Sequence, residues 1–106
     1  MNVFENIPYQ DEGLGKRKVF DEKHLQIMQI ALKSGQSVPQ HKANSYVHLL
    51  VLRGRVIVDL DGADHKLKEG DLLPVDFKTP MIIKNPSDKD ATFLVIKAPN
   101  PSEMPK

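Results

Sequence analysis

The sequence predicts an all-β fold, a sandwich or a barrel, with little room for helices. From residue 24 onward the chain consists of short apolar runs, most of them rich in Val, Ile and Leu. These runs recur at spacings of roughly ten residues, and turn-favouring residues such as Gly, Pro and Asp separate them. Short strands in this arrangement are typical of antiparallel sandwiches and barrels.

Seven strands are expected between residues 24 and 98. In chain order their sequences are HLQIMQIAL, YVHLLVLR, RVIVDLD, HKLK, DLLPV, PMIIK and ATFLVIKA. The pair Asp61-Gly62 lies between the third and fourth runs, and Asp-Gly is a favoured two-residue turn of a β-hairpin. A hairpin is therefore expected at this point.

The two ends of the chain differ from this pattern. Residues 1–23 mix Gly, Pro and charged residues without sustained periodicity, so we expect an arm that lies over the surface. Residues 99–106 contain three prolines, which cannot continue a central strand, so we expect a tail. Between them, we expect residues 24–98 to form one domain, since 106 residues suit a single domain of roughly 100–150 residues.

Composition excludes several classes of partner and site. The chain has 15 Lys and Arg against 14 Asp and Glu, so its net charge of +1 provides no field that would hold nucleic acid or an anionic membrane. It has no cysteine, which excludes disulfides, thiolate zinc sites and cysteine nucleophiles. The first residues lack the apolar run of a signal peptide, and no run approaches the roughly 20 residues of a membrane span. We therefore expect a cytoplasmic protein without nucleic-acid or membrane partners.

Two spacings of residues carry a resemblance to a known family. The pattern G(X)5HXH(X)3,4E(X)6G has its positions at Gly35, His41, Ala43, Val47 and Gly54. The pattern G(X)5PXG(X)2H(X)3N has its positions at Gly70, Asp76, Lys78, Met81 and Asn85. With these spacings, residues 24–98 resemble the small single-domain cupins. The resemblance implies a double-stranded β-helix, which is the jelly-roll cupin barrel.

The resemblance also implies where a metal would be held, and most of those positions are changed. Cupins place three His and one Glu there, whereas this chain has His41, Ala43, Val47 and Met81. Ala and Val offer no lone pair, and a thioether suits copper(I) more than iron, manganese, nickel or zinc. We therefore expect no cofactor. A metal, if one binds, would be held weakly by His41 with Met81 or His48.

Two further expectations concern the faces of the strand around Val47. Side chains alternate along a strand, so if Val47 points into the barrel, His48 points out of it. Leu50 and Leu52 then lie on the same outer face as His48, where one core does not account for them. A second layer over that face, in a sheet-on-sheet homodimer, is expected unless the arm covers it.

The sequence thus predicts a non-catalytic module that binds a small molecule in an apolar barrel. The candidate ligand-binding residues are His41, Lys42, Tyr46 and Met81, at the mouth of the barrel, and no catalytic residue can be named. The alternative is a metal-dependent cupin enzyme, an isomerase or dioxygenase acting on a small oxygenated substrate, with His41 and non-standard ligands. A third possibility is a structural or regulatory dimer whose barrel is filled by its own side chains.

Overall fold

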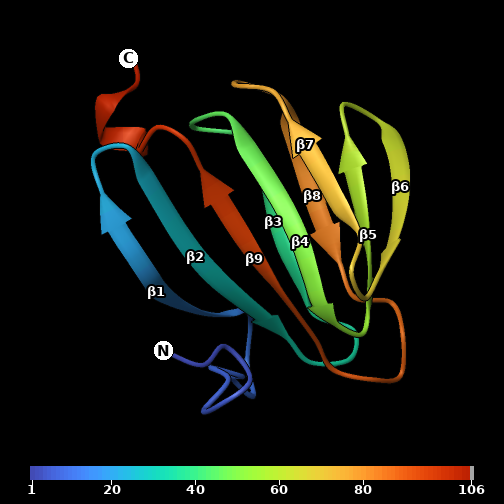
Figure 1. The fold of residues 1–106 in the computed structure, drawn as a ribbon. Helices are drawn as coiled ribbons and strands as arrows, with labels where there is room; N and C mark the ends of the chain where they lie inside the picture. Colours follow the sequence, from blue (N-terminus) through green and yellow to red (C-terminus); the bar gives the residue numbers. More distant parts are fainter. Residues whose placement is uncertain (106) are drawn as a thin grey trace.

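The structure is a computed structural model that describes residues 1–105, and it consists of two antiparallel sheets packed face to face (Figure 1). The first sheet has the strand order β1-β2-β9-β4-β7 and the second the order β3-β8-β5-β6. The elements are β1 (Gly15–Glu22), β2 (Leu25–Leu32), β3 (Ser37–Lys42), β4 (Val47–Arg53), β5 (Arg55–Leu60), β6 (Ala63–Lys68), β7 (Leu72–Val75), β8 (Pro80–Lys84), β9 (Ala91–Lys97) and the 3-10 helix η1 (Pro101–Glu103). The predicted all-β fold is confirmed, and each of the seven expected runs is a strand.

Two strands, β1 and β3, were not predicted from the sequence. Both are edge strands, as β6 and β7 are, and both consist mainly of polar and charged residues that conceal an apolar pattern. Strand β1 pairs with β2 along its length, so the irregular arm is shorter than the expected 1–23 and ends before Gly15. In β3 the register to β8 shifts between Val38 and His41, and Pro39 lies within that shift. Proline is tolerated at such an edge irregularity because its missing N–H breaks no ladder bond.

The core lies between the two sheets and follows the alternation of the strands. In β4 the inward residues Val47, Leu49 and Val51 are almost fully buried, whereas His48 is exposed. The largest fully buried side chain is Phe93 of β9, which lies opposite Val51. This register confirms the expected direction of Val47 and, with it, the outward direction of His48.

The turn between β5 and β6 has the expected hairpin form. Asp61 and Gly62 have φ values of 50° and 90°, as the tight turn favoured by right-handed strand twist requires. The N–H of Gly62 also donates to Oδ1 of Asp59 at 2.8 Å. No helix of residues 1–105 is long and apolar enough to cross a membrane.

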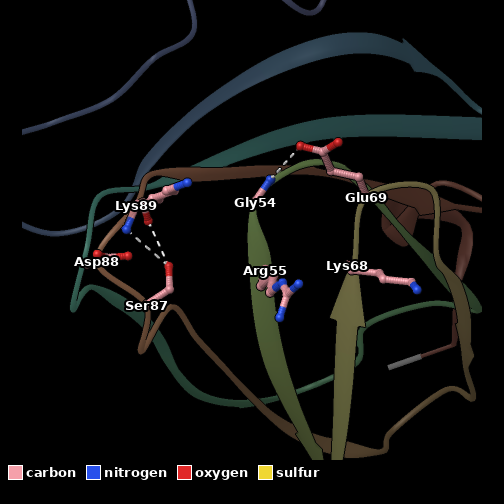
Figure 2. Close-up of a pocket in the computed structure, with 7 residues that line it drawn as sticks. All are labelled: Gly54, Arg55, Lys68, Glu69, Ser87, Asp88 and Lys89. Carbon is pink, nitrogen blue, oxygen red and sulfur yellow. Dashed lines mark hydrogen bonds between the residues drawn. The ribbon is translucent and has the colours of Figure 1, made fainter.

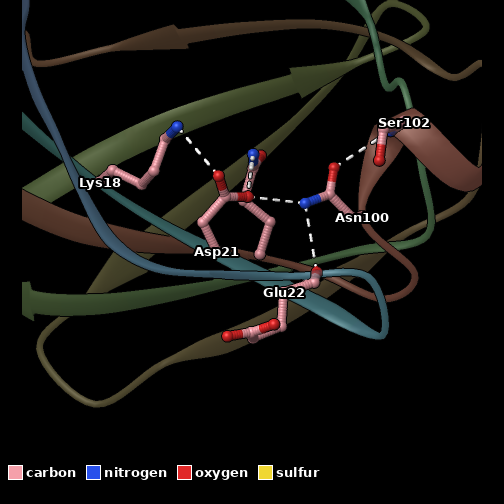
Figure 3. Close-up of polar contacts among 6 residues, drawn as sticks. Lys18, Asp21, Glu22, Asn100 and Ser102 are labelled. Carbon is pink, nitrogen blue, oxygen red and sulfur yellow. Dashed lines mark hydrogen bonds and ion pairs between the residues drawn. The ribbon is translucent and has the colours of Figure 1, made fainter.

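The C-terminal tail is docked against the turn between β1 and β2 (Figure 3). Nδ2 of Asn100 donates to Oδ1 of Asp21 at 2.7 Å and to the carbonyl of Glu22 at 3.2 Å. Oδ1 of Asn100 accepts from the N–H of Ser102 at 3.0 Å and so caps η1. Asp21 also pairs with Lys18 at 3.0 Å, and hydrogen bonds from Lys18, Gln26 and Asn100 together lower its pKa.

The N-terminal arm covers part of the outer face of the first sheet. The arm's backbone carbonyls accept from Gln29, whose Nε2 lies 2.8 Å from the carbonyl of Val3, and from Arg17, whose Nη1 lies 2.9 Å from the carbonyl of Asn6. The guanidinium of Arg53 stacks 4.7 Å above the ring of Phe4. These contacts explain how Gln29, a polar residue on an outer sheet face, is fully buried.

Candidate functional site

The space between the sheets contains a cavity of about 210 Å³ that opens at one end of the barrel. Strands of both sheets line it, and most of its wall is apolar. The apolar lining includes Met28, Ile30, Val47, Leu49, Met81 and Ile83. Four polar side chains line it as well, namely Lys16, His41, Asn44 and Lys97. An enclosed apolar space with a few polar groups is the usual form of a small-molecule site.

His41 and Met81 lie directly opposite each other on the paired strands β3 and β8. Nδ1 of His41 lies 3.0 Å from the carbonyl of Pro39. Because a carbonyl can only accept, Nδ1 must donate in this contact, so the neutral ring carries its lone pair on Nε2. Met81 is buried, whereas His41 is exposed at the end of the cavity. The structure therefore brings together two of the four predicted ligand-binding residues.

Lys97 enters the cavity from the last position of β9. It lies opposite Val47 of β4, an inward residue, and it is half-buried. Burial lowers the pKa of Lys97, and the nearby charge of Lys16 lowers it further. Lys16 lies opposite the inward Ile30 across the β1–β2 pair. The side chains of Lys16, which is exposed, and of the half-buried Lys97 thus both line the cavity, and neither was predicted as a site residue.

Comparison with known proteins identifies the family. The family model for the cupin domain matches residues 28–97, well over half of the chain. This protein is a cupin. An uncharacterized protein of Methanocaldococcus jannaschii is 36% identical to it over 88 residues, which are 82% of this chain and 76% of that protein.

Solved structures of other cupins share the fold. The solved structure of that same Methanocaldococcus jannaschii protein, an RmlC-like cupin with a double-stranded β-helix fold, superposes with a TM-score of 0.80 at 33% identity and covers 90% of each chain. An RmlC-like cupin from Desulfovibrio desulfuricans superposes with a TM-score of 0.84 at 25% identity and covers 93% of this chain and 94% of that one. The predicted cupin barrel is therefore confirmed.

The residues of this cupin do not fit the metal that its family implies. Ala43 and Val47 line the cavity with methyl groups where cupins present His and Glu. Only the imidazole of His41 remains as a ligand for a borderline metal, and the thioether of Met81 is soft. The ammonium of Lys97, opposite Val47, adds a positive charge that repels a metal cation. Within residues 1–105, no three His, Asp or Glu side chains gather closely enough to hold a metal ion.

Three other residues named from the sequence lie away from the cavity lining. Lys42, the last residue of β3, and Tyr46, in the loop before β4, are exposed and are not among the residues that line the cavity. Tyr46 is 52% exposed and its ring lies 6.1 Å from that of Phe77. His48 is exposed on the outer face of β4.

A second hollow is a groove on the surface, open to solvent and lined by polar and charged residues (Figure 2). This groove of about 520 Å³ lies beside the β4–β5 turn and the loop between β8 and β9. Figure 2 shows the N–H of Gly54 directed at Glu69, 3.3 Å away, and Ser87 bonded to the backbone of Lys89. Its lining has mixed charges and no apolar side chain, so the smaller barrel cavity is the better candidate for a specific site.

Proposed function

We propose that this cupin binds a small molecule in its barrel cavity and does not use a metal centre of the family type. The observation that supports the proposal is the combination of a cavity of about 210 Å³ with methyl groups at two of the positions where cupins hold metal. An apolar cavity of about 150 Å³ is large enough to bind benzene. A ligand of about six to ten non-hydrogen atoms is therefore of the right size.

The four methionines of the chain provide a test with an internal control. Met28 and Met81 line the cavity, whereas Met1 lies in the arm and Met104 in the tail. With methyl-labelled methionine, a fragment that binds in the barrel should shift the NMR signals of Met28 and Met81 and leave the other two unchanged. A fragment library of this size that moves neither signal would contradict the proposal.

A variant that fills the cavity supplies the matched control. Ala43 is buried and lines the cavity, while Ala63 is exposed at the start of β6. Ala43→Leu adds three carbons inside the cavity and should abolish fragment binding, and Ala63→Leu adds the same group outside and should leave it intact. Binding that survives Ala43→Leu would place the ligand elsewhere. Fragment binding that requires added metal and is lost with chelator would favour the enzyme alternative.

We also propose that the protein is a homodimer that buries the outer face of its first sheet. The arm contacts this face around Gln29, Arg17 and Arg53, and a row of apolar side chains remains on the rest of the face. The row crosses all five strands of the first sheet, and its members are Phe20, Ile27, Ile96, Leu94, Leu50 and Leu72. Phe20 is 41% and Leu72 is 56% exposed. A continuous apolar row on a sheet face is typical of a surface that packs against a second sheet.

A further inference from the structure

The cavity of this cupin contains positive charge without negative charge. Lys16 and Lys97 line it, and no Asp or Glu is among the lining residues. The two ion pairs of residues 1–105 involve other lysines, Lys18 with Asp21 and Lys33 with Asp11. The ammonium groups of Lys16 and Lys97 are thus without a carboxylate partner in the part of the chain that is described.

The sheet register directs both lysines to the cavity. Lys97 follows the inward residues Phe93 and Val95 at the same two-residue spacing, and it lies opposite Val47. Lys16 lies opposite Ile30, which lines the cavity. One strand, β2, separates β1 from β9 in the sheet. Both side chains therefore approach the cavity from the same wall.

This arrangement is unfavourable in the empty protein and favourable once an anion is present. A half-buried ammonium loses part of its hydration, and a second ammonium nearby repels it, which agrees with the lowered pKa of Lys97. A carboxylate between the two would replace the lost hydration and remove the repulsion, since charge-assisted hydrogen bonds are the stronger kind. A cationic ligand would add a third positive charge.

We propose that the cavity binds a small organic monocarboxylate with an apolar body, whose carboxylate is held by Lys97 and Lys16. The inference rests on the proposed small-molecule binding and names the class of ligand. Two carboxylate oxygens match two ammonium groups, and the side chains of Met28, Leu49 and Ile83 surround the apolar body. The apolar walls disfavour a phosphate or a dicarboxylate, because each carries a second charge that would have to be desolvated.

Three probes of nearly equal size and different charge test the inference. They are benzoate, its neutral analogue benzamide, and the cation benzylammonium, titrated at pH 7 while the signals of Met28 and Met81 are followed. Benzoate should bind at least about tenfold more tightly than benzamide, since hydrogen bonds between two charged groups are stronger than those to a neutral amide. Benzylammonium should bind more weakly than either.

Lysine variants then locate the charge. Lys97→Met and Lys16→Met keep the length and apolar stem of the side chain, and each should weaken benzoate binding about tenfold while changing benzamide binding less than about twofold. Lys84→Met is the matched control, because Lys84 is exposed at the end of β8 and lies outside the cavity lining. It should leave all three probes unaffected. Either cavity variant alone is sufficient for the test if the other folds poorly.

The outcomes separate this inference from the proposed function. If benzamide or benzylammonium binds as tightly as benzoate and moves Met28 and Met81, the preference for an anion is wrong and small-molecule binding stands. If benzoate binding is preferred but unchanged in both Lys97→Met and Lys16→Met, the assignment of the lysines is wrong. If no probe shifts either methionine, both proposals are contradicted for ligands of this size.

Discussion

Replacing Gly54 with alanine should destabilise this cupin by about 2–5 kcal/mol, and the same change at Gly70 by only about 1–2 kcal/mol. The two glycines share a left-handed backbone, with φ values of 78° and 86°, so each substitution incurs the roughly 1–2 kcal/mol that a side chain costs there. Around Gly70 no atom lies within 4 Å of the added methyl group. Gly70→Ala therefore measures the backbone term alone.

At Gly54 the added methyl group also meets packed backbone. It would lie 2.5 Å from the carbonyl oxygen of Asp90 and 2.9 Å from Cα of Ala91, and Ala91 is fully buried at the start of β9. Something must shift, and overpacking of this kind costs about 1–3 kcal/mol. Added to the backbone cost of about 1–2 kcal/mol, this gives about 2–5 kcal/mol for Gly54→Ala. The two variants should therefore differ in free energy of unfolding by about 1–3 kcal/mol.

Urea unfolding of both variants at one protein concentration measures this difference. For a domain near 100 residues, each 1 kcal/mol also lowers Tm by about 4–8 °C, so thermal unfolding provides an independent check. Equal losses for Gly54→Ala and Gly70→Ala would refute the reasoning, because they would mean that the approach of Asp90 and Ala91 to Gly54 adds nothing. The result matters for the family pattern, since both glycines are among its fixed positions.

Three other predictions follow from the site and the surface. The purified protein should carry less than about one tenth of an equivalent of iron, manganese, nickel or zinc, and chelator should leave its Tm unchanged, since one imidazole holds little of a coordination shell; near-stoichiometric metal that is lost in His41→Ala would show the opposite. Sedimentation should give a mass near twice 11.9 kDa, and Leu50→Lys should lower it to that of one chain, whereas a mass that Leu50→Lys does not change would argue against this interface. Burial first, and then the charge of Lys16, lower the pKa of Lys97 below its ordinary value of 10.5. Between the folded and unfolded pKa values the unfolded chain binds more protons than the folded one, so the free energy of unfolding rises with pH in that range. Lys97→Met should lack this rise in urea unfolding as the pH approaches 10.5 from below, and an identical pH profile in the two proteins would contradict the assignment.

The fold could be predicted where strands are buried on at least one apolar face. The runs that became β2, β4, β5, β8 and β9 show this directly, because their Val, Ile and Leu residues supply the core. Strands β1 and β3 could not be found in the same way, since their sequences, GKRKVFDE and SVPQHK, have few apolar residues and no sustained alternation. The missed edges are also where Lys16 and His41 enter the cavity.

The candidate site could be predicted only in part, for related reasons. His41 and Met81 were found because a spacing pattern marks their positions. Lys97 could have been found by extending the alternation of Phe93 and Val95 by one more step, although a lysine at a strand end is normally taken as exposed. Lys16 had no usable signal, because its direction depends on the pairing of β1 with β2 and on nothing in its own neighbourhood.

The docking of the tail connects the last residues of the chain to the entrance of the cavity. Oγ of Ser45 donates to the carbonyl of Pro99 at 2.5 Å, and the N–H of Ala98 donates to the carbonyl of Tyr46 at 3.0 Å. These two contacts hold the loop that begins with Asn44, a residue of the cavity lining.

Asn100 binds the turn that follows β1, at the end of that strand remote from Lys16. We expect release of the tail to loosen the loop that contains Asn44 and so to open the entrance. We expect a group attached behind residue 106 to alter how fast a ligand enters and leaves, without touching any residue that holds it.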